Sequence, residues 1–160
     1  MKLVLMALIL ISSLYGKSKL EYAWNRLTYE EQHLIYKSYK TGLEHDIGLS
    51  LAAINWQESV GGRYRISMDG NDVGIYHVNL YWYFKELNIE NTMWNRSKYA
   101  TILITKPKIE ESYVIYKLLN LKSIHKEWVD VWTAYNGSKE YSIKILNKVR
   151  FLRRKFKHFK

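Results

Sequence analysis

The sequence predicts a mainly α-helical domain in which several helices are interrupted by one long Gly-rich loop or short hairpin. Apolar residues recur at the three-to-four-residue spacing of a helix over most of the chain. Proline occurs only once, whereas Gly, Asn and Asp gather between residues 59 and 74 and break the helical pattern there. The chain has 160 residues, of which 48% are hydrophobic, enough for one domain with a core and too few for two.

The first 16 residues have the pattern of a signal peptide. The positively charged start Met1–Lys2 precedes the uninterrupted apolar run from Leu3 to Ile11, which is too short to span a bilayer. Cleavage is expected near Gly16, and the alternatives are a buried N-terminal helix or an uncleaved anchor. We therefore expect export to the periplasm or cell envelope, where a chain without cysteine must be stable without disulfides.

An N-terminal helical extension is expected over residues 17–45. Thr28 followed three residues later by Glu31 is the signature of a capping box. The helix that it opens should stop at Gly42.

The main domain is expected over residues 46–160, with Asp46 as the candidate N-cap of its first helix. One face of that helix carries a stripe of 3.6-residue period, formed by Ile47, Leu51, Ile54 and Glu58. A glutamate thus stands on an apolar stripe, directly before the glycine-rich loop.

Three further helices are predicted after the loop. Asn79 caps a helix through "LYWYFKEL", and residues 93–104 form the next, where a helix is preferred to a strand. Pro107 starts the third, which runs to Ile124.

Two more helices complete the chain. One ends near Asn136–Gly137, and Ser138 opens the other. The apolar stripe of the last helix consists of Ile145, Val149, Leu152, Phe156 and Phe159. Its basic tail, 150–160, either leaves its charges in water or lies, beyond the apolar part, on an anionic membrane or cell wall.

The net charge of +10 favours an anionic partner: cell-wall polymer, lipid headgroups or nucleic acid. Loss of the leader with its single lysine would leave +9. No metal or cofactor is expected, since the histidines lack metal-ligand spacing and no glycine loop has the sequence of a phosphate-binding loop. The many aromatic residues are mostly core by their spacing, and Trp82 or Tyr83 is the first candidate to stack on a sugar.

Several interpretations of Glu58 are open. It is a solvated charge at a helix end, a partner of Arg63 or Arg65, a cap for the amides of the loop, or a catalytic acid. Its place on the apolar stripe argues against the solvated charge, because burial disfavours the ionised form and raises the pKa of a carboxyl group. A glutamate of this kind holds a proton near neutral pH and donates it to a leaving group.

Four short motifs resemble the soluble lytic transglycosylases. They are "ES" at 58–59, Ser67 nine residues after the glutamate, "DVGIYHVN" at 72–79 and "AYNGS" at 134–138. The resemblance covers about residues 46–150 and is nearest to the small transglycosylases linked to conjugation or secretion. It implies a lysozyme-like α+β fold and cleavage of the β-1,4 bond between MurNAc and GlcNAc in peptidoglycan. The product would carry 1,6-anhydroMurNAc; the partner would be a glycan strand and not nucleic acid.

The resemblance also implies roles for single residues. Glu58 would act first as general acid and then as base, with the 2-acetamido group of the substrate as internal nucleophile. Ser67 and Tyr135 would contact the acetamido group or the acid. Asn79 and Asn136 would hold the fold or a sugar.

His77 is the main departure from the family pattern, because it stands where glutamine is usual. It could bind substrate as the glutamine does, with a charge that varies with pH. The alternatives to a transglycosylase are a lysozyme-like muramidase, which shares the acid but uses water, and a non-catalytic basic protein that binds cell wall or membrane.

Overall fold

The structure, a computed structural model, describes residues 19–157 and is mainly helical, as the sequence predicts. The predicted signal peptide and Phe159 lie outside the described residues. After a helical stretch at 19–25, the elements are α2 (Tyr29–Leu43), α3 (Gly48–Ser59), β1 (Asp72–Val73), β2 (Val78–Asn79), α4 (Leu80–Glu86), α5 (Met93–Thr105), α6 (Pro107–Ile124), α7 (Trp128–Asn136) and α8 (Lys139–Phe156).

Local signals at the helix ends are confirmed. Thr28 and Glu31 form the capping box of α2, whose last residue lies one position beyond the predicted stop. The other confirmed signals are the N-caps Asn79 and Ser138, Pro107 in the first turn of α6, the helix over 93–105, and Gly137 in left-handed conformation after α7.

The predicted N-cap Asp46 is wrong. Helix α3 begins at Gly48, its N-cap is Ile47 without a side-chain cap, and Asp46 has a φ of 58° in the preceding turn. The reason is the close approach of α2 and α3: a Cβ on Gly42 would lie 2.7 Å from the Gly48 Cα. Burial of Ile47, which is 3% exposed, holds the tight turn that this approach requires.

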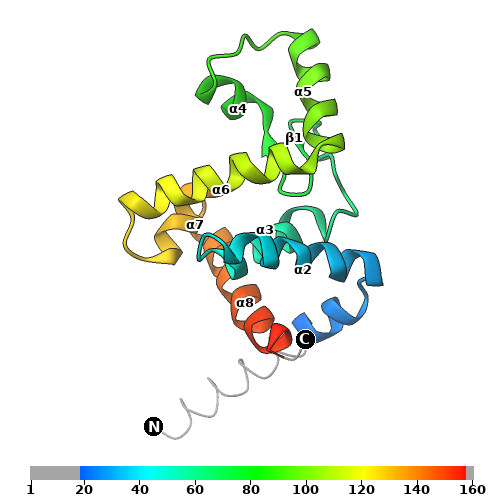
Figure 1. Ribbon diagram of the computed structural model, residues 1–160, viewed down its shortest axis with the longest axis vertical. Helices are drawn as coiled ribbons and strands as arrows, with labels where there is room; N and C mark the ends of the chain where they lie inside the picture. Colours follow the sequence, from blue (N-terminus) through cyan, green and yellow to red (C-terminus); the bar gives the residue numbers. More distant parts are fainter. Residues whose placement is uncertain (1–18, 158–160) are drawn as a thin grey trace, which may run out of the picture.

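Helix α3 lies at the centre of the fold, between α2 and α8 (Figure 1). The N-terminal stretch packs on the same core, where the ring of Trp24 lies 5.3 Å from that of Trp56 and 5.8 Å from that of Phe151. Core packing therefore runs across the predicted boundary between 17–45 and 46–160. None of the described helices is both long and apolar enough to cross a membrane.

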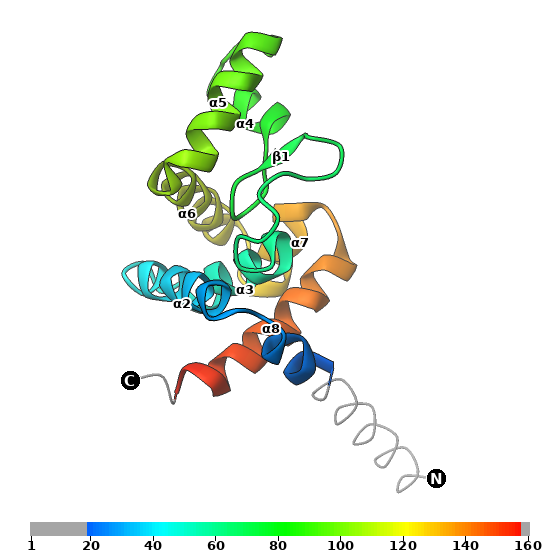
Figure 2. The same ribbon diagram turned by 90° about the vertical axis from the view of Figure 1, so that its right-hand side faces the viewer.

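Most of the glycine-rich segment 59–74 is a loop with turns, closed by an isolated bridge between Ile66 and Val73, and its end leads into a short hairpin at 72–79. Strands β1 and β2 pair antiparallel, with Asp72 opposite Asn79. The hairpin leads into α4 and α5, which extend away from α2, α3 and α8 (Figure 2). Helix α6 returns along the molecule to α7 (Figure 1). The hairpin and α4 thus face the end of α3 and the end of α7.

Candidate active site

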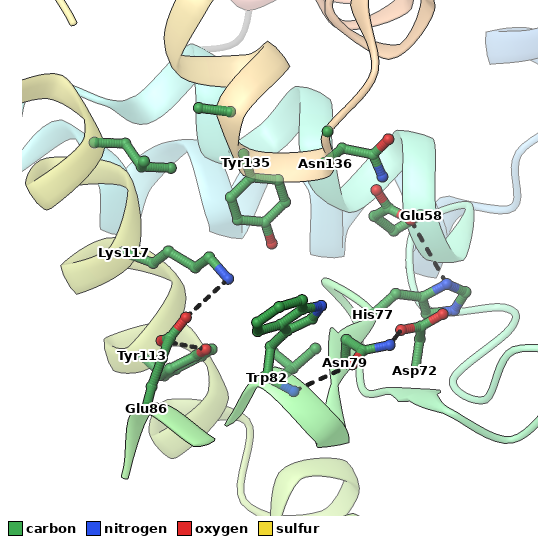
Figure 3. A pocket seen from close by; sticks show the side chains of 14 residues that line it. Glu58, Asp72, His77, Asn79, Trp82, Glu86, Tyr113, Lys117, Tyr135 and Asn136 are labelled. Carbon is green, nitrogen blue, oxygen red and sulfur yellow. Dashed lines mark hydrogen bonds and ion pairs between the residues drawn. The ribbon is translucent and has the colours of Figure 1, made fainter. Parts of the chain in front are cut away.

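A cleft of about 690 Å³ opens where these elements meet (Figure 3). It is lined by the end of α3, the hairpin, α4, α6 and the end of α7. Five of the six sequence-predicted site residues line it: Glu58, His77, Asn79, Tyr135 and Asn136. Residues more than 70 positions apart in the sequence are therefore brought to one surface.

Glu58 lies in the last turn of α3, and the structure holds that end of the helix firmly. The chain leaves the helix through Val60, with a φ of 57°. The hydroxyl of Ser59 donates to the carbonyl of Ile75 at 2.7 Å and accepts from the amide of Gly62 at 2.8 Å. The neighbour of Glu58 therefore ties the end of α3 to the hairpin.

The interpretations of Glu58 as an arginine partner or a cap are not what the structure shows. Arg63 makes two bonds to Glu31, at 2.6 and 2.7 Å, and Arg65 donates to backbone carbonyls. Ser59 takes the capping role. The ionic neighbour of Glu58 is His77, whose Nδ1 lies 3.7 Å from Oε2 of Glu58.

Burial raises the pKa of Glu58 above that of an ordinary glutamate. The carboxylate of Asp72 acts in the same direction, while Tyr141, His77 and Lys148 act against it. The Tyr141 hydroxyl faces the carboxyl group but makes no hydrogen bond of standard geometry within the described part of the chain. Glu58 is thus a mostly buried carboxyl group, 17% exposed, that opens onto a cleft and favours its protonated form.

His77 has a φ of 49°, in the left-handed region that non-glycine residues rarely adopt. Its Nε2 lies 2.8 Å from the carbonyl oxygen of Tyr64, while Nδ1 faces Glu58. The departure from the family pattern therefore stands directly beside the candidate acid.

Glu110 on α6 holds the backbone that precedes His77. Its two carboxylate oxygens accept from the amides of Ile75 and Tyr76, at 2.9 and 2.6 Å, and the side chain has no exposed surface. Burial raises the pKa of Glu110 to about 7, although the two amides oppose this. The sequence analysis did not single out Glu110.

Asn79 and Asp72 support each other at the hairpin. The Asn79 side chain accepts from the amide of Trp82, as the N-cap of α4, and donates to Asp72 at 2.8 Å. Two roles were predicted for Asn79, to hold the fold or to hold a sugar. These bonds show that its side chain holds the fold. The Asp72 carboxylate lines the cleft and had been predicted only as part of a motif.

Tyr135 and Asn136 close the cleft from the end of α7 (Figure 3). Burial and the neighbouring Glu58 raise the pKa of the Tyr135 hydroxyl well above its ordinary value, so it stays protonated. Asn136 is exposed, and its side chain points to the same side of the cleft as Glu58 (Figure 3).

Ser67 is the predicted site residue that does not line this cleft. Its hydroxyl donates to Asp69 at 2.5 Å and accepts from the amide of Asp72 at 2.9 Å. These bonds close the outer turn of the loop, away from Glu58.

At the other end of the cleft, a group of residues from α4 and α6 comes together. Glu86 accepts from the hydroxyl of Tyr113 at 2.7 Å and from Lys117 at 3.2 Å (Figure 3). Trp82, one of the two predicted sugar-stacking candidates, lines the cleft and is half-exposed, whereas Tyr83 is buried.

Within residues 19–157, no three His, Asp or Glu side chains gather closely enough to hold a metal ion. No family model, no curated protein and no solved structure matches this chain. The function is therefore argued from the cleft itself.

Proposed function

We propose that this chain is a peptidoglycan lytic transglycosylase that cleaves the β-1,4 bond between MurNAc and GlcNAc. The observation that carries the proposal is Glu58, a mostly buried carboxyl group with a raised pKa that opens onto a cleft. An acid for a glycosidic oxygen has to hold its proton until the proton is donated, and burial shifts Glu58 in that direction. The motifs that resemble the family also supply Asp72, His77, Asn79, Tyr135 and Asn136, which line the same cleft.

The chemistry needs one carboxyl group. Glu58 donates its proton to the glycosidic oxygen, and the bond from that oxygen to C1 breaks as the carbonyl oxygen of the 2-acetamido group bonds to C1. The Glu58 carboxylate then takes the proton of the C6 hydroxyl, and O6 displaces the acetamido oxygen from C1. The 1,6-anhydro ring closes, the proton is back on Glu58, and no water is consumed.

The other cleft residues suit a glycan substrate. The exposed ring of Trp82 offers a face to a sugar, and Asn136 offers amide hydrogen-bonding groups. Tyr135, kept protonated, remains a hydrogen-bond donor beside Glu58. This mixture of an aromatic face and neutral polar groups fits a strand of N-acetylated sugars.

A lysozyme-like muramidase is the second candidate, and Asp72 is the observation in its favour. Asp72 lines the cleft and lies close enough to Glu58 to raise its pKa. A second carboxylate of this kind is what a hydrolase uses as nucleophile or to stabilise charge at C1. In that reaction water, and not O6, would release the product.

Digestion of purified peptidoglycan, followed by mass spectrometry, tests the proposal. The expected products end in anhydroMurNAc, and products that end in reducing MurNAc would favour the muramidase. The Glu58→Gln variant should lose about 10² to 10⁴ in rate, since it cannot donate the proton. Glu90→Gln, an exposed glutamate, is the matched control and should keep full activity.

A non-catalytic role would rest on the basic surface of α8. Its exposed cations are Lys139, Lys144, Arg150, Arg153 and Arg154, and the exposed Lys157 follows the helix. We propose that this surface contacts anionic cell wall or membrane after export, in addition to catalysis. The Glu58→Gln variant tests this role. If it clears cell walls as well as the wild type does, and salt abolishes the clearance, then the positive charge of the protein and not Glu58 is responsible for the clearance.

A further inference from the structure

We propose that His77 is a positioning residue for Glu58, and that its charge helps to set the pH range of glycan cleavage. The inference deepens the proposed function and rests on it, because it concerns the same acid. It explains why this chain has a histidine at the position where the family pattern has glutamine.

The hydrogen bond to Tyr64 determines which nitrogen of His77 carries a proton. A carbonyl oxygen only accepts, so Nε2, 2.8 Å from the Tyr64 carbonyl, must be the N–H of the ring. In the neutral ring Nδ1 then has a lone pair, and it faces Oε2 of Glu58 at 3.7 Å. A proton on Nδ1 would therefore make His77 a cation directly beside Glu58, and this favours the carboxylate form of the glutamate.

The fold holds His77 in this position from the backbone side. Glu110 accepts from the amides of the two preceding residues, Ile75 and Tyr76. Ser59, next to Glu58 in the sequence, donates to the carbonyl of Ile75 at 2.7 Å. The left-handed φ of 49° at His77 costs free energy, and these bonds hold the segment in that conformation.

Other charged and titratable groups also face the pair. Asp72 on the hairpin raises the pKa of Glu58, whereas Lys148 and Tyr141 on α8 lower it. The hydroxyls of Tyr135 and Tyr141 stay protonated, because burial raises their pKa values well above the ordinary range. Burial and the neighbouring Lys144 lower the pKa of Lys148 to about 8. The effect of Lys148 on the pH profile therefore has to be distinguished from that of His77.

Positive charge on His77 lowers the pKa of Glu58. Removal of that charge should therefore extend the protonated form of Glu58 to higher pH.

The pH profile of His77→Gln tests the inference. Glutamine keeps a hydrogen-bonding group but has no charge, and we expect kcat at the optimum to stay within about tenfold of the wild type. The high-pH limb of the kcat profile should move up by about one pH unit, as expected for loss of a charge near a carboxylate. A limb that stays in place would overturn the inference.

Two control variants accompany it. His45→Gln removes an exposed histidine and should leave the profile unchanged. Lys148→Met removes the lysine that titrates nearby; if it alone moves the limb, Lys148 and not His77 sets the pH range.

A second measurement does not depend on activity. In ¹⁵N-histidine NMR spectra at high pH, His77 should show the Nε2–H tautomer, and its Nδ1 should take up a proton at lower pH in Glu58→Gln than in the wild type. The opposite tautomer, or an unchanged Nδ1 transition, would contradict the pairing of His77 with Glu58. Absence of glycan cleavage with this NMR behaviour present would instead mean that the proposed function is wrong and the pairing is right.

Discussion

Two buried carboxyl groups, Glu58 on α3 and Glu110 on α6, face the same short hairpin from different sides. Burial raises the pKa of both. Glu110 has no exposed surface, and both of its oxygens accept from backbone amides. Glu58 is 17% exposed to the cleft, and its closest charged neighbour is the side chain of His77. The two groups share the direction of the pKa shift, and they differ in access and in free hydrogen-bonding capacity.

The comparison separates a structural acid from a candidate catalytic one. A raised pKa in a cleft is a sign of function, but a buried structural carboxyl group shows the same shift. The two sites are also coupled, since the amides that Glu110 holds belong to the residues directly before His77. The structural carboxyl group therefore positions the neighbour of the candidate catalytic one.

Gly74→Ala is expected to have the largest effect on this arrangement. A Cβ at Gly74 would lie 2.2 Å from Cδ of Glu110, and φ is +87° there. Either Glu110 or the hairpin must move, which should lower the free energy of unfolding by about 3 kcal/mol or more. Chemical denaturation measures the loss.

Gly70→Ala is the matched control for that substitution. Gly70 has a similar φ of +70°, but nothing lies within 4 Å of its Cβ position. The cost should be that of the left-handed backbone alone, about 1–2 kcal/mol. Equal losses in the two variants would show that Glu110 does not hold the hairpin in the way described.

The next largest effect is expected in the pH dependence of stability, which should distinguish the two carboxyl groups. Folding raises the pKa of Glu110 from 4.5 to about 7, so its contribution is fully present below pH 4.5 and is lost as pH rises through 7. The loss across this interval is about 3 kcal/mol. In Glu110→Gln this part of the pH dependence should disappear, and below pH 4.5 the variant should be less stable than the wild type because an amide nitrogen would face a backbone N–H.

The pH dependence of the stability of Glu58→Gln is to be compared with that of Glu110→Gln. Glu58→Gln should change the pH dependence in the same direction, because the pKa of Glu58 is also raised, but it should not lower stability at pH 7. Among residues 19–157, no backbone amide is left without an acceptor when Glu58 is replaced. A Glu58→Gln variant as unstable as Glu110→Gln would remove the distinction between the two sites.

The parts of the fold that depend on local chemistry could be predicted from the sequence. Thr28 with Glu31, Pro107, Ser138 and Gly137 act within one turn of their own helices, and the structure confirms each. The prediction of Asp46 as an N-cap was wrong because a tertiary contact, the approach of α2 to α3, decides where α3 begins.

The site was predictable where a short motif holds several of its residues. Glu58, His77 and Asn79 lie within 22 positions of one another in the sequence, and the structure places all three at the cleft. Glu110 bonds to residues 34 and 35 positions away, which no spacing rule connects. A signal was nevertheless present, because Glu110 shares one face of α6 with the buried Val114 and Leu118, as Glu58 does with the apolar stripe of α3.

The outer half of the loop allows the smallest but most specific test of the resemblance. The family pattern implies that Ser67 contacts the substrate or the acid, whereas its hydroxyl here bonds to Asp69 and the amide of Asp72. Ser67→Ala should therefore lower the free energy of unfolding by about 1 kcal/mol, the value of a typical hydrogen bond, and change kcat less than threefold. Tyr135→Phe, at a residue that lines the cleft, is the comparison and should reduce kcat more. A large loss of kcat in Ser67→Ala with unchanged stability would mean that the loop closes over the substrate and brings Ser67 to Glu58.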